Sequence, residues 1–169
     1  MEGNIDEGIN QYLTFILADE LYAINVSNIK EVLSVPKITR VPRMPDFMNG
    51  VINLRGNVVP VLDLRQKFGL EPTPHTIDTG IIVTEIENMF EEESSSFIVG
   101  IFSDLVQKVV EIAPEEIEPP PSIGVTIDTS FISGMGRLDD SFVIILDIHK
   151  ILSEKELLHM QMNEEVVNV

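Results

Sequence analysis

Short apolar runs separated by close turns recur along the chain. The run QYLTFIL, which begins at Gln11, is followed almost at once by LYAINV, and this pattern predicts a β-hairpin turning between Ala18 and Glu20. IIVTEIE and SFIVGIF, on either side of an acidic, serine-rich link, predict a second hairpin. IKEVLSV and QKVVEI are each expected to form a strand after a helical turn. Runs this short suit small β-barrels, whereas a helical bundle needs longer segments with a 3.6-residue period.

Several of these runs belong to an internal repeat. FMNGVINLRGNVVPVLDL, from Phe47, aligns without a gap with FISGMGRLDDSFVIILDI, from Phe131. AINVSNIKEVLSV, from Ala23, matches GIFSDLVQKVVEI, from Gly100, more weakly. The later copy carries extra residues between its two matching stretches, around APEEIEPPPSIGVT, whose prolines exclude helix and central strand alike. We therefore expect an all-β chain with short helices, built as two small barrels of about five strands each.

Two aspartates at equivalent places in the repeat are expected to begin helical turns. In DLRQKFG, Asp63 stands at an N-cap position with Gln66 three residues later, which is a capping-box pattern, and Gly69 follows the end of the turn. Asp147 in DIHKIL takes the same place in the second copy, without the Glu or Gln partner. Because capping explains both carboxylates, we assign Asp63 and Asp147 a structural role.

The side chains that carry most enzyme chemistry are absent or scattered. The chain has no cysteine, and its three histidines lack the spacing of metal ligands, so the sequence predicts no metal site, no cofactor and no enzyme. Asp139 and Asp140 resemble a carboxylate pair, but aspartate is expected in the hairpin turn that follows Leu138. A small acid–base hydrolase that uses Asp139, Asp140 and Asp63 is the alternative from a different functional class.

Arg55 stands apart because the repeat does not require it. Its counterpart in the second copy is Asp139, and Gly56 is matched by Asp140, so the fold accepts an acidic turn at this place. An arginine on a hairpin turn of a rigid barrel is typical of a hot spot for a protein partner. The alternative is a solvated surface cation, and the residues alone leave both readings open.

Charge and hydropathy limit the partners and the compartment. The formal net charge of −17 repels phosphate backbones, which argues against nucleic acid and anionic membrane surfaces as partners. No apolar run approaches the roughly 20 residues that span a bilayer, and the N-terminus lacks a signal sequence. We expect a soluble, cytoplasmic protein without direct membrane insertion, with flexible termini at residues 1–10 and 163–169.

Five stretches follow one another in an order that resembles a known family. They are YLTFILADELYAINV, NIKEV, VPRMPDFMNGVINLRGNVVPVLDLRQKFG, GIFSDLVQKVVEI and FISGMGRLDDSFVIILDIHKIL. Together they resemble the CheW family, the coupling proteins of bacterial chemotaxis. The resemblance implies a single CheW-like domain over residues 11–158, made of two intertwined SH3-like, five-stranded β-barrels, with no enzymatic activity and no cofactor. It also implies a cytoplasmic scaffold, recruited to membrane-attached receptor arrays, that links the regulatory domain of the CheA histidine kinase to the cytoplasmic helical hairpin of chemoreceptors.

The same resemblance implies a set of receptor-binding residues, which line or border an apolar groove between the barrels. Ile29 and Glu31 lie in NIKEV, Gly50 and Arg55 in GVINLRG, and Val109 in QKVVEI. Two of them have alternative readings: Gly50 suits a turn with positive φ, as its counterpart in the second copy suggests, and Val109 suits a core position. Residues that contact the kinase have no short motif and stay unassigned.

Two related proteins are alternatives within this family. The same domain forms the regulatory end of CheA-type kinases, and a relative joins it to a phosphorylatable receiver domain. Because the chain begins with Met1 and ends near Val169 without a receiver domain, we favour the stand-alone coupling protein.

Overall fold

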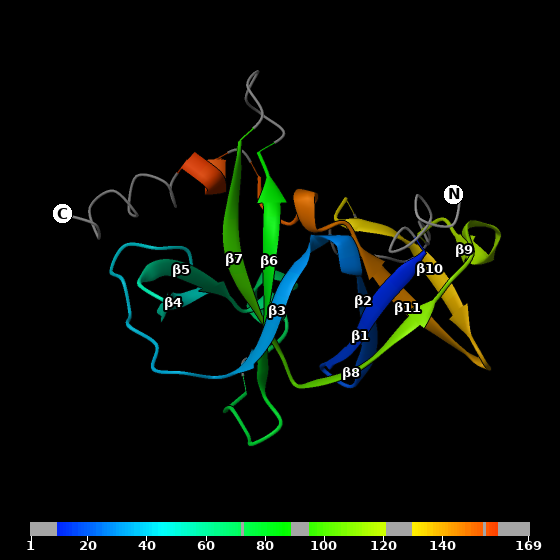
Figure 1. The fold of residues 1–169 in the computed structure, drawn as a ribbon, viewed down its shortest axis with the longest axis horizontal. Helices are drawn as coiled ribbons and strands as arrows, with labels where there is room; N and C mark the ends of the chain where they lie inside the picture. The colour runs from blue at the N-terminus through cyan, green and yellow to red at the C-terminus, as the bar shows by residue number, and fades with distance from the viewer. Residues whose placement is uncertain (1–9, 72, 89–94, 121–129, 154, 159–169) are drawn as a thin grey trace.

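Two β-sheets lie side by side, as the short apolar runs predict (Figure 1). The computed structural model describes residues 10–71, 73–88, 95–120, 130–153 and 155–158, so nearly all of the two expected flexible termini lies outside the described residues. The strands are β1 (Gln11–Leu17), β2 (Glu20–Asn25), β3 (Ile29–Ser34), β4 (Met48–Leu54), β5 (Asn57–Leu62), β6 (Gly80–Glu87), β7 (Ser96–Ser103), β8 (Leu105–Glu111), β9 (Ile117–Glu118), β10 (Ile132–Leu138) and β11 (Ser141–Leu146). The named helical elements are η1 (Val26–Asn28), α2 (Leu64–Lys67), η2 (Pro114–Glu116) and η3 (Ile148–Lys150), and residues 155–158 are helical as well.

Each sheet combines strands from both copies of the repeat. One sheet has the order β8-β1-β2-β11-β10-β9 and the other the order β3-β6-β7-β5-β4. In Figure 1 the blue strands β1 and β2 therefore lie beside the orange strand β11, far from them in sequence. The chain passes from one sheet to the other after β2 and back again after β7. The expectation of five strands holds for one sheet, and the other has a sixth, the two-residue β9.

The hairpins of the repeat pair in the same register, which confirms the internal repeat. In β4–β5 and in β10–β11 the ladder shifts at a bulge after the first pair and then runs to the turn. The parallel contacts with the other copy also correspond. The equivalent pairs are Met48↔Leu62 with Ile132↔Leu146, Leu54↔Asn57 with Leu138↔Ser141, and Val61↔Gly100 with Ile145↔Ala23.

Two local expectations differ from the structure. A 3₁₀ turn, η1, leads into β3 as expected, but β8 follows β7 through a bend at Asp104 without a helical turn. The Asp104 carboxylate accepts a hydrogen bond from the Ala18 N–H at 2.9 Å, so a side chain holds this connection. The proline-rich segment contains η2 and the edge strand β9. Both are compatible with proline, since Pro114 stands at the first position of the turn and β9 is the last strand of its sheet.

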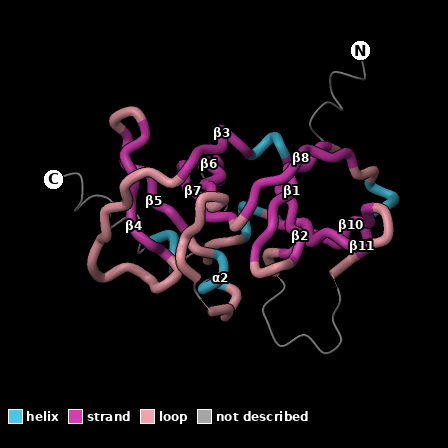
Figure 2. The backbone as a smooth tube through the Cα atoms, turned by 90° about the horizontal axis from the view of Figure 1, so that it is seen from below, coloured by secondary structure: helices cyan, strands magenta, loops and turns pink. Residues whose placement is uncertain are grey.

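Apolar side chains form one core within each sheet unit and a larger core shared by both. The shared core contains Phe15 and Tyr22 from one sheet and Ile82 and Ile101 from the other, so the two sheets fold against each other. A row of stacked aromatic rings runs through it, with centroid separations of 5.9, 5.8 and 4.7 Å, along Phe15, Tyr22, Phe68 and Phe131. Helix α2 lies at this junction (Figure 2).

Asp63 and Asp147 begin the two helical turns. The Asp63 carboxylate accepts from the Arg65 N–H at 3.0 Å, and the Asp147 carboxylate accepts from the His149 N–H at 3.1 Å. The Asp63 side chain binds the N–H of Arg65, the second residue of α2. The capping-box pattern predicts a bond to the N–H of the third residue, Gln66. Gly69, with φ 79°, ends α2 in a left-handed conformation.

Candidate functional site

The β4–β5 hairpin presents Arg55 at its turn. Arg55 and Gly56 both have positive φ, at 51° and 88°, which is the backbone of a tight two-residue hairpin turn. The Asn53 side chain accepts from the Gly56 N–H at 2.8 Å and fixes the turn. Asp139, the counterpart of Arg55, has nearly the same φ, at 50°. The fold therefore sets the backbone at this turn but not the charge of its side chain.

Arg55 reaches from the turn to Glu31 on β3. The two side chains form an ion pair through Arg55 Nη2 and Glu31 Oε2, and a second, longer hydrogen bond joins Nη1 to Oε1 at 3.4 Å. The hydrogen bonding and the positive charge of Arg55 lower the pKa of the Glu31 carboxyl, and Glu31 in turn raises the pKa of Arg55. The Arg55 side chain remains 70% exposed, so its charge is available to a partner.

A groove of about 560 Å³ runs beside this ion pair. Polar and apolar side chains both line it, and they come from β3, from the β4–β5 hairpin, from β6 and from β7. The main members are Glu31, Leu54, Arg55, Val58, Phe97 and Ile98. The structure thus brings Glu31 and Arg55, which are distant in sequence, to one hollow on the surface.

Ile29 and Val109 lie on strands at the margins of the two sheets. β3 begins at Ile29, which is half-buried and packs against the shared core. Val109 lies on β8 in the other sheet, and its residue is 52% exposed. The alternative reading of Val109 as a core residue is therefore wrong, and its counterpart Val32 is also exposed, at 44%. Both strands end their sheets, so one side of each has no neighbouring strand among the described residues.

Gly50 is buried within β4 and serves the fold. Its φ is 151°, and a Cβ there would overlap with the carbonyl oxygen of Thr39, which bridges to Val51 across the strand. At the equivalent Gly134, a Cβ would lie 2.9 Å from the carbonyl oxygen of Glu118 on β9. The reading of these glycines as turn residues is wrong, since both lie inside strands, although the φ of Gly50 is positive as expected. Each position requires glycine because a neighbouring segment approaches its backbone too closely for a side chain.

The carboxylates of the hydrolase alternative do not share a site. Asp139 and Asp140 are exposed at the β10–β11 turn, whereas Asp63 is buried in the other half of the repeat and caps α2. Burial raises the pKa of Asp63, and the hydrogen bond from Arg65 opposes part of this rise. Within the part of the chain that the structure describes, no group of three or more His, Asp or Glu side chains could hold a metal ion.

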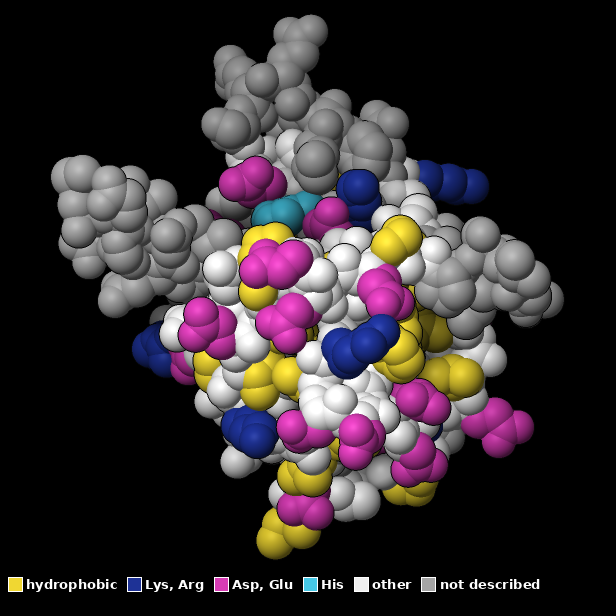
Figure 3. Space-filling view, turned by 90° about the vertical axis from the view of Figure 1, so that its right-hand side faces the viewer, with side chains coloured by type: hydrophobic (Ala, Val, Ile, Leu, Met, Phe, Trp, Pro, Cys, Tyr) yellow, Lys and Arg dark blue, Asp and Glu magenta, His cyan; other side chains and the backbone are white. Residues whose placement is uncertain are grey.

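On one face of the molecule the acidic side chains are spread out. Figure 3, which shows the face at the right of Figure 1, has acidic side chains dispersed among apolar ones with few basic residues between them. No helix among the described residues is long and apolar enough to cross a membrane. Beside Arg55 the lining of the groove is mixed: it includes the acidic Glu31, the basic Lys30 and several apolar side chains.

Comparison with known proteins identifies the fold and the family. A family model described as "CheW-like domain" matches residues 11–156. The chain belongs to the CheW family. It is 35% identical to the chemotaxis protein CheW of Klebsiella aerogenes, over 87% of this chain and 84% of that protein.

A solved structure and a second relative agree with this assignment to the CheW family. The crystal structure of the scaffolding protein TtCheW from Thermoanaerobacter tengcongensis superposes with a TM-score of 0.75 at 35% identity, over 87% of this chain and 94% of that one. The chemotaxis protein CheV3 of Helicobacter pylori is 26% identical, but the match covers only 44% of its length. The chain is therefore a chemotaxis coupling protein of the scaffold type.

Sequence reasoning named Glu31 and Arg55 separately and missed their pairing. The opposite charges were the available signal, but nothing in the sequence placed β3 beside the β4–β5 turn. Lys30 and Glu85, a second ion pair at 3.1 Å beside this surface, were missed for the same reason.

Proposed function

We propose that the chain couples the cytoplasmic helical hairpin of a chemoreceptor to the regulatory domain of a CheA histidine kinase. It does this as a cytoplasmic scaffold without catalytic activity of its own, and it joins membrane-attached receptor arrays through its partners. The observation that carries the proposal is the exposed Arg55–Glu31 pair beside a groove, on a member of the CheW family.

The pair suits recognition better than it suits stabilisation of the fold. An exposed ion pair contributes little to folding, so the sheet does not depend on it. Arg55 can bind a carboxylate on a receptor helix through two parallel hydrogen bonds, and Glu31 can accept from a receptor cation. Until a partner arrives, each side chain holds the other in an extended position beside the groove.

Apolar contacts supply the rest of the receptor surface in this proposal. Ile29 precedes the pair on β3, and Val109 offers an exposed apolar side chain on β8. An amphipathic helix laid into a groove makes contacts of this kind with its apolar face. Gly50 allows Thr39 to approach β4. Its contact with the receptor, which the resemblance implies, stays a prediction.

Coupling follows from binding two partners at once. A scaffold that holds receptor and kinase together raises their effective concentration for each other, and no chemistry by the scaffold is required. The higher identity to the Klebsiella CheW, 35% against 26% for CheV3, supports the coupling protein. An excised regulatory domain of a CheA-type kinase is the second candidate.

The test is reconstitution with purified receptor fragment and kinase. We expect kinase autophosphorylation to respond to the receptor only when this chain is present, and the chain alone to phosphorylate nothing. Phosphoryl transfer by the chain alone, or receptor control of the kinase in its absence, would contradict the proposal. A gain of kinase activity when the chain is fused to a catalytic domain, without any receptor response, would favour the second candidate.

A further inference from the structure

Each passage of the chain between the two sheets is held by a polar side chain from a helical turn of the repeat. The passage from β7 to β8 runs through Asp104, and Arg65 of α2 binds it. The passage from β2 to β3 runs through η1, and His149 of η3 binds Asn28 there. Arg65 and His149 occupy equivalent positions, since each follows its capping aspartate by one intervening residue in the gapless alignment of the repeat.

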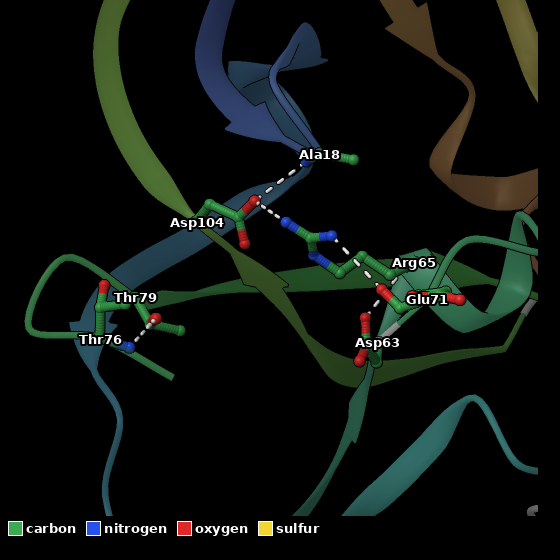
Figure 4. Close-up of polar contacts among 7 residues, drawn as sticks. All are labelled: Ala18, Asp63, Arg65, Glu71, Thr76, Thr79 and Asp104. Carbon is green, nitrogen blue, oxygen red and sulfur yellow. Dashed lines mark hydrogen bonds and ion pairs between the residues drawn. The ribbon is translucent and has the colours of Figure 1, made fainter. Parts of the chain in front are cut away.

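The first of these contacts is an ion pair that joins three segments (Figure 4). Arg65 Nη2 pairs with Asp104 Oδ2, and the same oxygen accepts from the Ala18 N–H at 2.9 Å in the β1–β2 turn. Arg65 Nη1 also donates to the Glu71 carbonyl at 3.4 Å. The Arg65 side chain is only 14% exposed, so this contact is largely shielded from solvent.

The second contact is a pair of hydrogen bonds to one imidazole ring. The Glu87 N–H, at the end of β6, donates to His149 Nδ1 at 3.0 Å. His149 Nε2 lies 3.2 Å from the Asn28 side-chain oxygen. Because Nδ1 already accepts, the neutral ring carries its proton on Nε2 and donates it to Asn28. One side chain thus ties η3 to the end of β6 and to the residue that precedes Ile29.

The two contacts lie at similar places in the two copies of the repeat, although their partners differ. The pair Leu13↔Val109 corresponds to Ile82↔Val32, because Val109 and Val32 are counterparts in the repeat, so β1 and β6 are equivalent strands. Leu13 is therefore the counterpart of Ile82, and counting the same number of residues along both strands makes Ala18 the counterpart of Glu87. The N–H groups of Ala18 and Glu87 are the two backbone donors. The partners are not counterparts, since Asp104 aligns with Ser27, and the Ala18 N–H binds Asp104 whereas the Glu87 N–H binds the His149 ring. Arg65 and His149 nevertheless hold the two connections between the sheets, by an ion pair in one copy and by hydrogen bonds in the other.

We propose that His149 is a positioning residue for the receptor-facing strand β3, and that Arg65 does the equivalent for β8. His149 acts without touching the receptor; it fixes Asn28, and through it the start of the strand that carries Ile29 and Glu31. The consequence for receptor binding rests on the function proposed above, whereas the consequence for the mobility of β3 does not.

Hydrogen exchange of the full chain tests the structural part. Replacing His149 by Ala should speed exchange at the Glu87 amide and along β3. Asp104→Asn, which keeps an acceptor for Ala18 but loses the charge that Arg65 binds, should speed exchange along β8 and leave β3 protected. Unchanged exchange along β3 in His149→Ala, or the same pattern in both variants, overturns the proposal. So does a ring ¹⁵N spectrum of the wild type that shows the proton on Nδ1.

Titration with a receptor helical-hairpin fragment tests the functional part. The Gln amide reaches the place of Nε2 and can still donate to Asn28, whereas the shorter Asn side chain offers an acceptor only near the place of Nδ1. We expect His149→Gln to bind the fragment like wild type, and His149→Asn and His149→Ala to lose about fivefold in affinity, the value of one hydrogen bond. Equal binding by all three variants overturns the positioning role. If the wild-type chain does not bind the fragment, the proposed function fails, and the exchange experiment alone decides the role of His149.

Discussion

Arg55 carries a charge at a turn whose counterpart in the repeat is acidic, so the fold does not depend on that charge. Arg55→Glu should leave the melting temperature nearly unchanged, because exposed surface substitutions have small effects on stability. It should weaken binding of a receptor fragment by about thirtyfold or more, as loss of a hot-spot arginine does. The matched control is Arg137→Glu, since Arg137 is also exposed and paired with a carboxylate, that of Glu118 at 2.9 Å. Normal receptor binding by Arg55→Glu, or a large drop in its melting temperature, would show that Arg55 has a different role.

The same ion pair has a consequence for the ionisation of Glu31. The hydrogen bond from Arg55 holds the pKa of Glu31 below its ordinary value of 4.5. A lowered carboxyl pKa adds stability above the unfolded value, and this contribution is lost as the pH falls through the folded value. In Arg55→Gln the Glu31 carboxyl should titrate at a higher pH than in wild type, as followed by ¹³C NMR of the side chain. An identical titration in both proteins would mean that the pair does not form in solution.

Asp63 caps α2, but its burial disfavours the charged form of its carboxyl group. Asp63→Ala removes the cap of α2 and should lower the free energy of unfolding by about 1 kcal/mol, while the folded fraction binds receptor as before.

Asp63→Asn keeps a good cap without a charge. Burial raises the pKa of Asp63 above the unfolded value, so this group makes the protein less stable as the pH rises from the unfolded to the folded value. Asn should remove that loss in melts across this range, and an unchanged pH profile would contradict this.

At the scale of the element, β4 is shaped by the segment that bridges to it at Thr39. Gly50→Ala places a methyl group against the Thr39 carbonyl oxygen and should destabilise the protein by about 2 kcal/mol or more, through steric overlap and an unfavourable φ. Gly56→Ala is the control, because a Cβ there meets no atom within 4 Å and only its φ of 88° opposes the change. Thermal melts should give Gly50→Ala a lower melting temperature than Gly56→Ala. The reverse order would mean that the Thr39 segment moves away easily.

At the scale of the whole molecule, the exchange of strands between copies makes the two sheets depend on each other. Residues 1–70 contain β1 to β5 and residues 71–169 contain β6 to β11, so neither fragment holds a complete sheet. We expect each fragment alone to lack a cooperative thermal transition, and an equimolar mixture to regain one. Calorimetry and gel filtration of the fragments and of their mixture provide the measurement. A cooperative transition in either fragment alone would show that one copy of the repeat folds by itself.

The sequence by itself determined the features that depend on neighbouring residues. Alternation of apolar side chains located the hairpins, aspartates marked the starts of α2 and η3, and the gapless repeat identified hairpins that pair in the same register. Motifs of the family were local too, which is why the resemblance pointed to a coupling protein. These properties follow from backbone geometry and short-range hydrogen bonds, which a short window of sequence contains.

Tertiary structure alone decided which strands share a sheet and which side chains meet. Alternation of apolar and polar residues indicates that one face of a strand is buried, but it does not indicate which strand pairs with it. The exposure of Val109, the need for glycine at position 50 and the pairing of Glu31 with Arg55 all depend on how distant segments are placed side by side. So does the link from His149 to Asn28, which joins η3 to η1 across most of the chain. Contacts between such distant residues are set by how the two sheets close over their shared core.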